Sequence, residues 1–185
     1  MTVTTIATEL KKLKNVLIIS HNRPDGDTVG SATALKLALN LLGINADLCC
    51  ESVIPEKYFF VTGANAYKLT DYYVNNVSSY DAVIGVDCST EVMYSNAYSV
   101  FNKGKKKFNI DHHISNSRYA DFNYVENTAS CCEIIYKLIV ALGVEITKDI
   151  ANCLMLGIVT DTGNFAHSSV TSETLEISST AIVYI

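Results

Sequence analysis

Asn15-Val-Leu-Ile-Ile-Ser20-His21-Asn-Arg-Pro-Asp25-Gly-Asp27 passes from an apolar run into a polar turn. The run from Asn15 to Ser20 has the length and composition of a buried strand. The segment from Gly30 to Leu42 is rich in alanine and leucine and stops at Gly43, so we expect a helix there. A buried strand, a turn and a helix in this order are typical of an α/β fold.

The same design recurs along the chain. Asp81-Ala-Val-Ile-Gly-Val-Asp87 and Lys107-Phe-Asn-Ile-Asp111 are apolar runs that end in an acid, and Asn45 to Cys50 is predicted as another strand. Later helices are predicted from Ser130, which has capping-box spacing to Glu133, to about Leu142, from Thr147 to about Ile158, and from near Thr171 through Ile185. This alternation predicts an α/β fold, in which helices flank a mostly parallel sheet in a Rossmann-like arrangement of three layers.

The composition fits one globular domain of ordinary size. Of the 185 residues, 49% are apolar and 18% are charged, which excludes an intrinsically disordered chain. The net charge of −5 excludes the global basic field that binds long nucleic acids. A polyanionic substrate would therefore depend on metal ions or on a few local cations.

The cysteines and the first residues indicate the compartment. Six cysteines without a Cys-x-x-Cys motif form neither a zinc ribbon nor a disulfide framework, so we expect free thiols. Met1 to Asn15 lacks the apolar core of an export signal, and no apolar run is long enough to cross a bilayer. We therefore expect a cytoplasmic protein with no membrane-spanning segment.

Four segments place acids or histidines just past an apolar strand or helix. Ligands of open parallel sheets bind outside the carboxyl ends of the strands, so side chains far apart in sequence can meet in one cleft there. The donors are all carboxylates and imidazoles, which suit Mn²⁺ or a similar divalent ion better than a structural zinc. The segments are His21 to Asp27, Asp87-Cys-Ser, Asp111-His112-His113, and Asp161-Thr-Gly-Asn.

Each segment has a structural alternative when it is taken alone. Asp25 and Asp27 are also typical of a turn that leads into a helix, and Asp87 of a cap for the next helix. Taken together, these carboxylates would repel one another strongly in one cleft, with Arg23 as the only arginine nearby. Two divalent ions would balance that charge.

In these motifs the chain resembles the DHH phosphoesterase family. The match is to its four signature segments, in the family's order, over roughly residues 15–170: His21-x-x-Pro-Asp25-x-Asp27 with Gly30-Ser31, Asp87, Asp111-His112-His113, and Asp161. Asp111-His-His-Ile-Ser-Asn116 and Gly157-Ile-Val-Thr-Asp161-Thr-Gly look most like the branch of bifunctional oligoribonucleases (nanoRNases) and pAp phosphatases. The resemblance implies an exonuclease-like hydrolase that acts on short oligoribonucleotides or on 3′-phosphoadenosine 5′-phosphate. Cyclic-dinucleotide phosphodiesterase and manganese-dependent inorganic pyrophosphatase stay open as alternatives.

The resemblance also implies a pair of metal ions, most fittingly Mn²⁺, which activate a hydroxide that attacks phosphorus. Asp87 would bridge the two ions. One ion would be held by His21, Asp25 and Asp87, and the other by Asp27, Asp87, His112 and Asp161.

Four further residues receive roles from the same resemblance. His113 would contact the scissile phosphate and stabilise the departing oxygen. Asp111 would orient a histidine ring, or else make a strand-end hydrogen bond to backbone. Arg23 would pair with a phosphate, or else be a solvated surface arginine. Asn116 would position a ligand or cap a turn.

The chain departs from the family pattern in two places. We interpret residues 1–185 as the catalytic DHH domain of a longer protein, without the C-terminal substrate-binding domain (DHHA1) of the family. Ala166-His167 stands where the oligoribonuclease branch often has an arginine. A catalytically silent module that binds nucleotide or metal is therefore a second alternative. The expected partner is a short RNA or a nucleotide, and a homodimer stays open.

Overall fold

The sheet is built around the apolar run at the start of the sequence. In the computed structural model, which describes residues 1–185, β1 (Asn15–Ile19) pairs with β2 (Asn45–Cys50) on one side and β4 (Ala82–Val86) on the other. The remaining strands are β3 (Lys68–Leu69), β5 (Lys107–Asp111) and β6 (Phe122–Val125). The strand order is β3-β2-β1-β4-β5-β6, and every neighbouring pair is parallel. The predicted α/β fold with a parallel sheet is confirmed.

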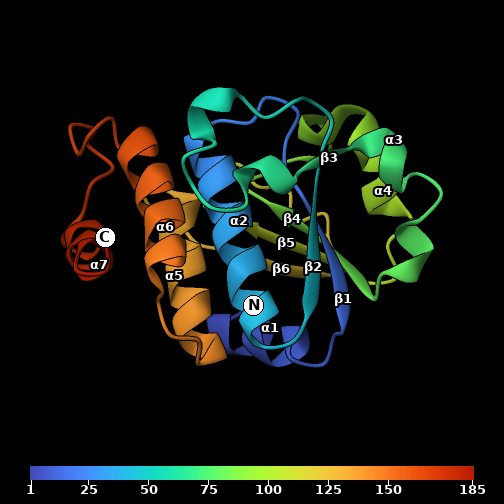
Figure 1. Ribbon diagram of the computed structural model, residues 1–185, viewed down its shortest axis with the longest axis horizontal. Coiled ribbons are helices and arrows are strands. Elements are labelled where there is room, and N and C mark those ends of the chain that lie inside the picture. The colour runs from blue at the N-terminus through green and yellow to red at the C-terminus, as the bar shows by residue number, and fades with distance from the viewer.

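Helices cover both faces of the sheet and complete three layers (Figure 1). They are α1 (Val3–Leu10), α2 (Gly26–Leu41), α3 (Thr70–Tyr73), α4 (Tyr98–Asn102), α5 (Cys131–Leu142), α6 (Lys148–Asp161) and α7 (Ser172–Ile182). In β1, Val16 and Ile18 point into a core of 42 buried residues shared with α1, α2, α5 and α6, while Leu17 and Ile19 face a core of 12 on the side of α3 and α4. Successive side chains of a strand point to opposite faces, so a continuous apolar run is what a strand covered on both faces requires.

The sequence predictions differ from the structure at the helix boundaries. α2 begins at Gly26 rather than Gly30, because Asp25 accepts a hydrogen bond from the Thr28 amide and caps the helix one turn earlier. α6 continues past Ile158 to Asp161. The prediction that the last helix runs through Ile185 was wrong, since α7 ends at Ile182. Beyond that point the side chains are largely exposed and add no buried contact that would hold a further turn.

α1, α3, α4, β3 and β6 were not predicted. They are short elements at the margins of the fold, with weaker patterns than the central strands. None of the helices combines the length and the apolar character needed to cross a membrane.

α2 and α6 pack unusually close together. A methyl group on Gly30 would collide with the carbonyl oxygen of Cys153, and one on Gly157 would lie 2.5 Å from Asp27 Oδ1 and 3.0 Å from Asp27 Cα. Glycine is therefore required at both positions by a neighbouring backbone rather than by an unusual dihedral angle. This contact brings the start of α2 beside the second half of α6.

Candidate metal centre

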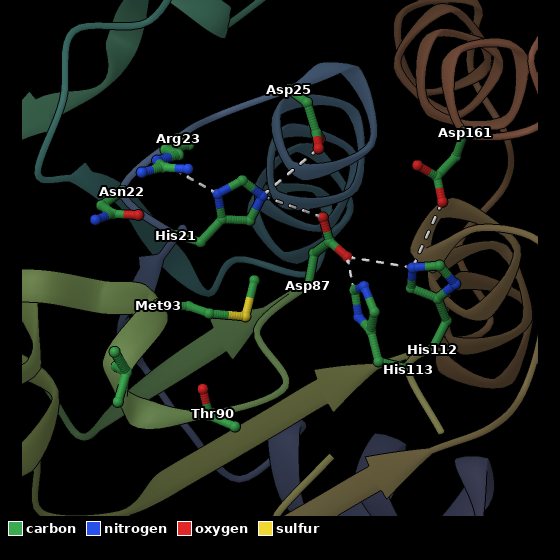
Figure 2. Close-up of a pocket in the computed structure, with 11 residues that line it drawn as sticks. His21, Asn22, Arg23, Asp25, Asp87, Thr90, Met93, His112, His113 and Asp161 are labelled. Atoms are coloured by element: carbon green, nitrogen blue, oxygen red, sulfur yellow. Dashed lines mark hydrogen bonds and ion pairs between the residues drawn. The ribbon is translucent and has the colours of Figure 1, made fainter. Parts of the chain in front are cut away.

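The candidate ligands meet at the carboxyl edge of the sheet, where three adjacent strands end. β1 leads into His21, β4 into Asp87, and β5 ends at Asp111 before His112 and His113. The first turn of α2 adds Asp25 and Asp27, and the last residue of α6 is Asp161. All six residues expected to bind metal are brought into one site, most of which Figure 2 shows.

One group of three donors consists of His21, Asp25 and Asp87. His21 Nε2 lies 3.7 Å from Asp25 Oδ2 and 3.6 Å from Asp87 Oδ2. The ligand atoms of this group lie within 4.8 Å of one another. Three donors at this spacing can surround one cation.

The second group consists of Asp27, His112 and Asp161. His112 Nε2 lies 3.9 Å from Asp27 Oδ2 and 3.5 Å from Asp161 Oδ2. A hydrogen bond of 3.1 Å joins His112 Nδ1 to the carbonyl oxygen of Thr128, which fixes the ring so that Nε2 faces the carboxylates. These are three of the four residues that the resemblance assigns to the second ion, and the fourth is Asp87.

Asp87 lies between the two groups (Figure 2). Its Oδ2 faces His21, and its Oδ1 lies 3.5 Å from His112 Nε2. Oδ1 is buried and has no hydrogen-bond partner in the structure. Burying a carboxylate oxygen without a partner is costly, so this atom fits a position that faces a cation.

The backbone aims Asp87 into the cleft. Its φ of 58° lies in the left-handed region, which aspartate and asparagine enter more readily than most residues. The Asp87 amide donates to the carbonyl oxygen of Ile110 at 3.0 Å, so the turn after β4 stays tied to β5. The side chain is thus directed by the end of the sheet rather than by a mobile loop.

Asp27 is held by the N-terminus of α5. The amides of Cys131 and Cys132 donate to its Oδ2 and Oδ1, at 2.6 Å and 2.9 Å. The positive end of a helix dipole stabilises a buried carboxylate at this place. The capping spacing from Ser130 correctly predicts this helix start, but no local signal in the sequence pairs it with Asp27.

The charges of the site are not balanced by the protein alone. Burial, together with the charges of Asp87 and Asp161, raises the pKa of Asp27 well above its usual value. Burial also raises the pKa of Asp161, to which Asp87 and Asp25 contribute, although His112 opposes the shift. Both shifts express the same excess of negative charge. Oxygen and imidazole donors around such an excess fit a pair of hard or borderline divalent cations.

His21 supplies a local positive charge. Burial disfavours its charged form, but hydrogen bonds and attraction from Asp25 and Asp87 outweigh it and raise the pKa to about 9. The pKa of Asp25 falls to about 2, because its bonds to His21 and to the Thr28 amide outweigh burial. One histidine does not balance four carboxylates.

His113 is supported from behind by Asp111. A hydrogen bond of 2.8 Å joins His113 Nδ1 to Asp111 Oδ1, and the pKa of His113 is raised chiefly by this bond. Asp111 is fully buried, and its Oδ2 accepts from Asn116 Nδ2 at 2.7 Å. The geometry agrees with the expectation that Asp111 orients a histidine ring. Asn116 lies behind Asp111, and its amide group is engaged there rather than in the cleft wall.

His113 also lies near the metal ligands. Asp87, His112 and His113 form a third set of donors with compatible spacing. The Nδ1 atom of His113 is 3.9 Å from Asp87 Oδ1 but is already bonded to Asp111. We therefore leave His113 out of the two ligand groups.

The ligands open into a cleft of about 500 Å³. Arg23 is exposed at its wall, where its backbone amide donates to His21 Nδ1 at 3.2 Å and its guanidinium forms no ion pair. Sequence reasoning missed a further part of the wall, which is formed by Thr90, Val92 and Met93. These residues come from the segment after β4 and carry no metal-binding pattern that would have identified them.

Comparison with known proteins agrees with the fold and identifies relatives of the chain. The chain is 30% identical over 181 residues to the bifunctional oligoribonuclease and PAP phosphatase NrnA of Thermus thermophilus, a match that covers 97% of this chain and 53% of that protein. It is also 30% identical over 171 residues to a probable manganese-dependent inorganic pyrophosphatase of Bacillus licheniformis, covering 87% of this chain and 52% of that one. The chain thus spans about half the length of these relatives.

A solved structure has the same fold over nearly the whole of this chain. An exopolyphosphatase-related protein from Bacteroides fragilis superposes with a TM-score of 0.92 at 22% identity, over 98% of this chain and 56% of that one. The N-terminal domain that defines the DHH family matches residues 15–158, which include five of the six candidate metal ligands. On this match, and with its ligand groups assembled in one cleft, the chain belongs to the DHH family.

Proposed function

We propose that this protein is a phosphoesterase that uses two Mn²⁺ ions to hydrolyse short oligoribonucleotides, 3′-phosphoadenosine 5′-phosphate, or both. The observation that carries this proposal is the buried, unpartnered Oδ1 of Asp87 between two sets of ligands. The names of the relatives support the substrates, because they describe an oligoribonuclease and PAP phosphatase. Manganese is supported by the pyrophosphatase relative and by the mixed oxygen and imidazole donors.

Asp87 would be shared by both ions. The first would be held with His21 and Asp25, and the second with Asp27, His112 and Asp161. Two bound divalent ions supply a nucleophile at neutral pH and neutralise charge on the phosphoryl oxygens.

Three further polar residues would assist the reaction. With His113 Nδ1 bonded to Asp111, Nε2 is the free ring nitrogen, and it would give its proton to the departing oxygen. Asn116 would steady this pair by holding the second oxygen of Asp111. Arg23, whose guanidinium has no ion pair in the protein, would bind a phosphate of the substrate at the cleft wall.

Short substrates are favoured by the charge of the protein. A net charge of −5 gives no long-range attraction for extended nucleic acids, so binding would depend on the metal centre and on Arg23. We further propose that residues 1–185 act as the catalytic domain and that a second, substrate-binding domain contributes to full activity. The six free cysteines support a cytoplasmic setting.

The function is tested by comparing the hydrolysis of three substrates in the presence of Mn²⁺. We expect release of mononucleotides from a short RNA, or of phosphate from 3′-phosphoadenosine 5′-phosphate, to exceed release of phosphate from pyrophosphate. Faster cleavage of pyrophosphate would favour the pyrophosphatase alternative. A lack of all these activities, both in this chain and in a longer protein that includes a second domain, would contradict the enzyme and favour a silent binding module.

His113→Ala is expected to lower kcat by about 10²–10⁴-fold, the usual contribution of a general acid. Because His113 is bonded to Asp111 rather than assigned to either ligand group, binding of both ions should be retained. Steady-state kinetics beside a calorimetric Mn²⁺ titration separates the two effects. Loss of an ion in this variant would show that His113 is a metal ligand instead.

A further inference from the structure

Thr28 contacts every member of the His21–Asp25–Asp87 group. Its backbone amide donates to Asp25 Oδ1 at 2.9 Å. Its hydroxyl donates to Asp87 Oδ2 at 2.6 Å and also contacts His21 Nε2. Thr28 is fully buried in the first turn of α2 and was not among the candidate residues identified from sequence.

The hydrogen bonds around Thr28 have a defined direction. His21 Nδ1 accepts from the Arg23 amide, and the Thr28 hydroxyl donates its proton to Asp87 Oδ2. The oxygen of the same hydroxyl contacts His21 Nε2, the ring nitrogen that faces Asp25 and Asp87. The hydroxyl stands between a histidine and a carboxylate that would otherwise bond directly.

This arrangement keeps the ligand atoms apart. A direct bond between His21 and Asp87 would bring nitrogen and oxygen to about 2.7–2.9 Å. With Thr28 in place they lie 3.6 Å apart, and Asp25 Oδ2 lies 3.7 Å from the same nitrogen. Ligand atoms that surround a divalent ion at about 2.0–2.2 Å are themselves about 3–4 Å apart. The gap thus has the width that an ion requires.

We propose that Thr28 is a positioning residue that holds this gap open and so sets the affinity for the ion of the His21–Asp25–Asp87 group. This role rests on the proposed metal-dependent function. Its effect should be larger on this ion, because Thr28 contacts all three of its ligands but only the shared Asp87 among the ligands of the other ion, which have separate supports. Asp27 is held by the amides of Cys131 and Cys132, and His112 by the carbonyl oxygen of Thr128.

The test compares three variants of α2. Thr28→Val removes the hydroxyl but keeps the shape of the side chain and the hydrogen bond from the backbone amide to Asp25. Thr28→Ser keeps the hydroxyl. Thr33→Val is the matched control, because Thr33 is equally buried on the same helix and its hydroxyl has no hydrogen-bond partner.

Mn²⁺ binding is measured by two-site calorimetry and, independently, by the electron paramagnetic resonance signal of unbound Mn²⁺. In Thr28→Val we expect affinity for one ion to fall by about 10–100-fold, as for other residues that orient ligands, and affinity for the second to change little. Thr28→Ser and Thr33→Val should bind both ions as the parent does. Thermal unfolding of the ion-free proteins confirms that each variant is folded.

Equal affinities of Thr28→Val and the parent for both ions would overturn the role of Thr28 while leaving the metal centre intact. An equal loss in Thr33→Val would also overturn it, because the effect would then reflect a general disturbance of α2. Absence of Mn²⁺ binding by the parent would instead refute the metal centre itself, and with it this role.

Discussion

Asp87→Asn is expected to abolish the thermal stabilisation that Mn²⁺ gives to this protein. At about 100 times its Kd, one bound ion adds about 2.7 kcal/mol, which for a chain of this length raises Tm by about 5–10 °C. Asp87 is shared by both ligand groups in our account, so its loss affects both ions at once. Asparagine tolerates the φ of 58° at this position, but its single carbonyl oxygen cannot bridge two cations.

The ion-free variant is expected to remain folded. Replacing Asp87 removes a charge that raises the pKa values of Asp27 and Asp161, so repulsion within the cleft decreases. Differential scanning calorimetry with and without Mn²⁺ measures both effects. Asp71→Asn, which removes an exposed carboxylate outside the site, is the control and should respond to Mn²⁺ as the parent does. A full Mn²⁺ response in Asp87→Asn would contradict the bridging role.

Gly157→Ala is expected to lower stability by about 1–3 kcal/mol and Mn²⁺ affinity by about 10-fold or more. The added methyl group would lie 2.5 Å from Asp27 Oδ1 and 3.0 Å from its Cα, and it would collide with Cys132 Sγ. The obstacle includes backbone, so α2 and α6 must separate. That movement displaces Asp27 from its own ligand group. Urea unfolding and calorimetric Mn²⁺ titration measure the two effects.

Gly143→Ala separates loss of stability from displacement of Asp27. Gly143 caps α5 with a φ of 75° and has no atom within 4 Å of the position of an added methyl group. Alanine there should cost about 1–2 kcal/mol of backbone strain without affecting Mn²⁺ affinity. If Gly157→Ala binds Mn²⁺ as tightly as Gly143→Ala, the close packing of α2 and α6 does not position the ligand.

The central strands and the candidate ligands are predictable from sequence because their signals are local. Strands β1, β4 and β5 are covered on both faces, so each of them is a continuous apolar run in the sequence. An acid or a histidine directly follows, and parallel strands bring their carboxyl ends to one edge. The convergence of His21, Asp87 and His112 follows from that geometry once the strands are adjacent.

The supports of the ligands are not predictable in this way, since they are contacts between distant segments. The hydrogen bonds between Asp27 and the start of α5 join two helices. No spacing in the sequence indicates how these helices lie relative to each other. The hydrogen bond from Asn116 to Asp111 depends on the path of the loop after β5. The role of Thr28 depends on α2 starting one turn earlier than its composition indicates, with Asp25 as its cap.

The central claim is that this site binds a bridged pair of divalent ions, and a calorimetric Mn²⁺ titration tests it most directly. We predict two ions per chain in the parent, with both lost or greatly weakened in Asp87→Asn. No specific binding by the parent, or binding that is indifferent to Asp87, would contradict the metal centre and leave only membership of the family and its fold.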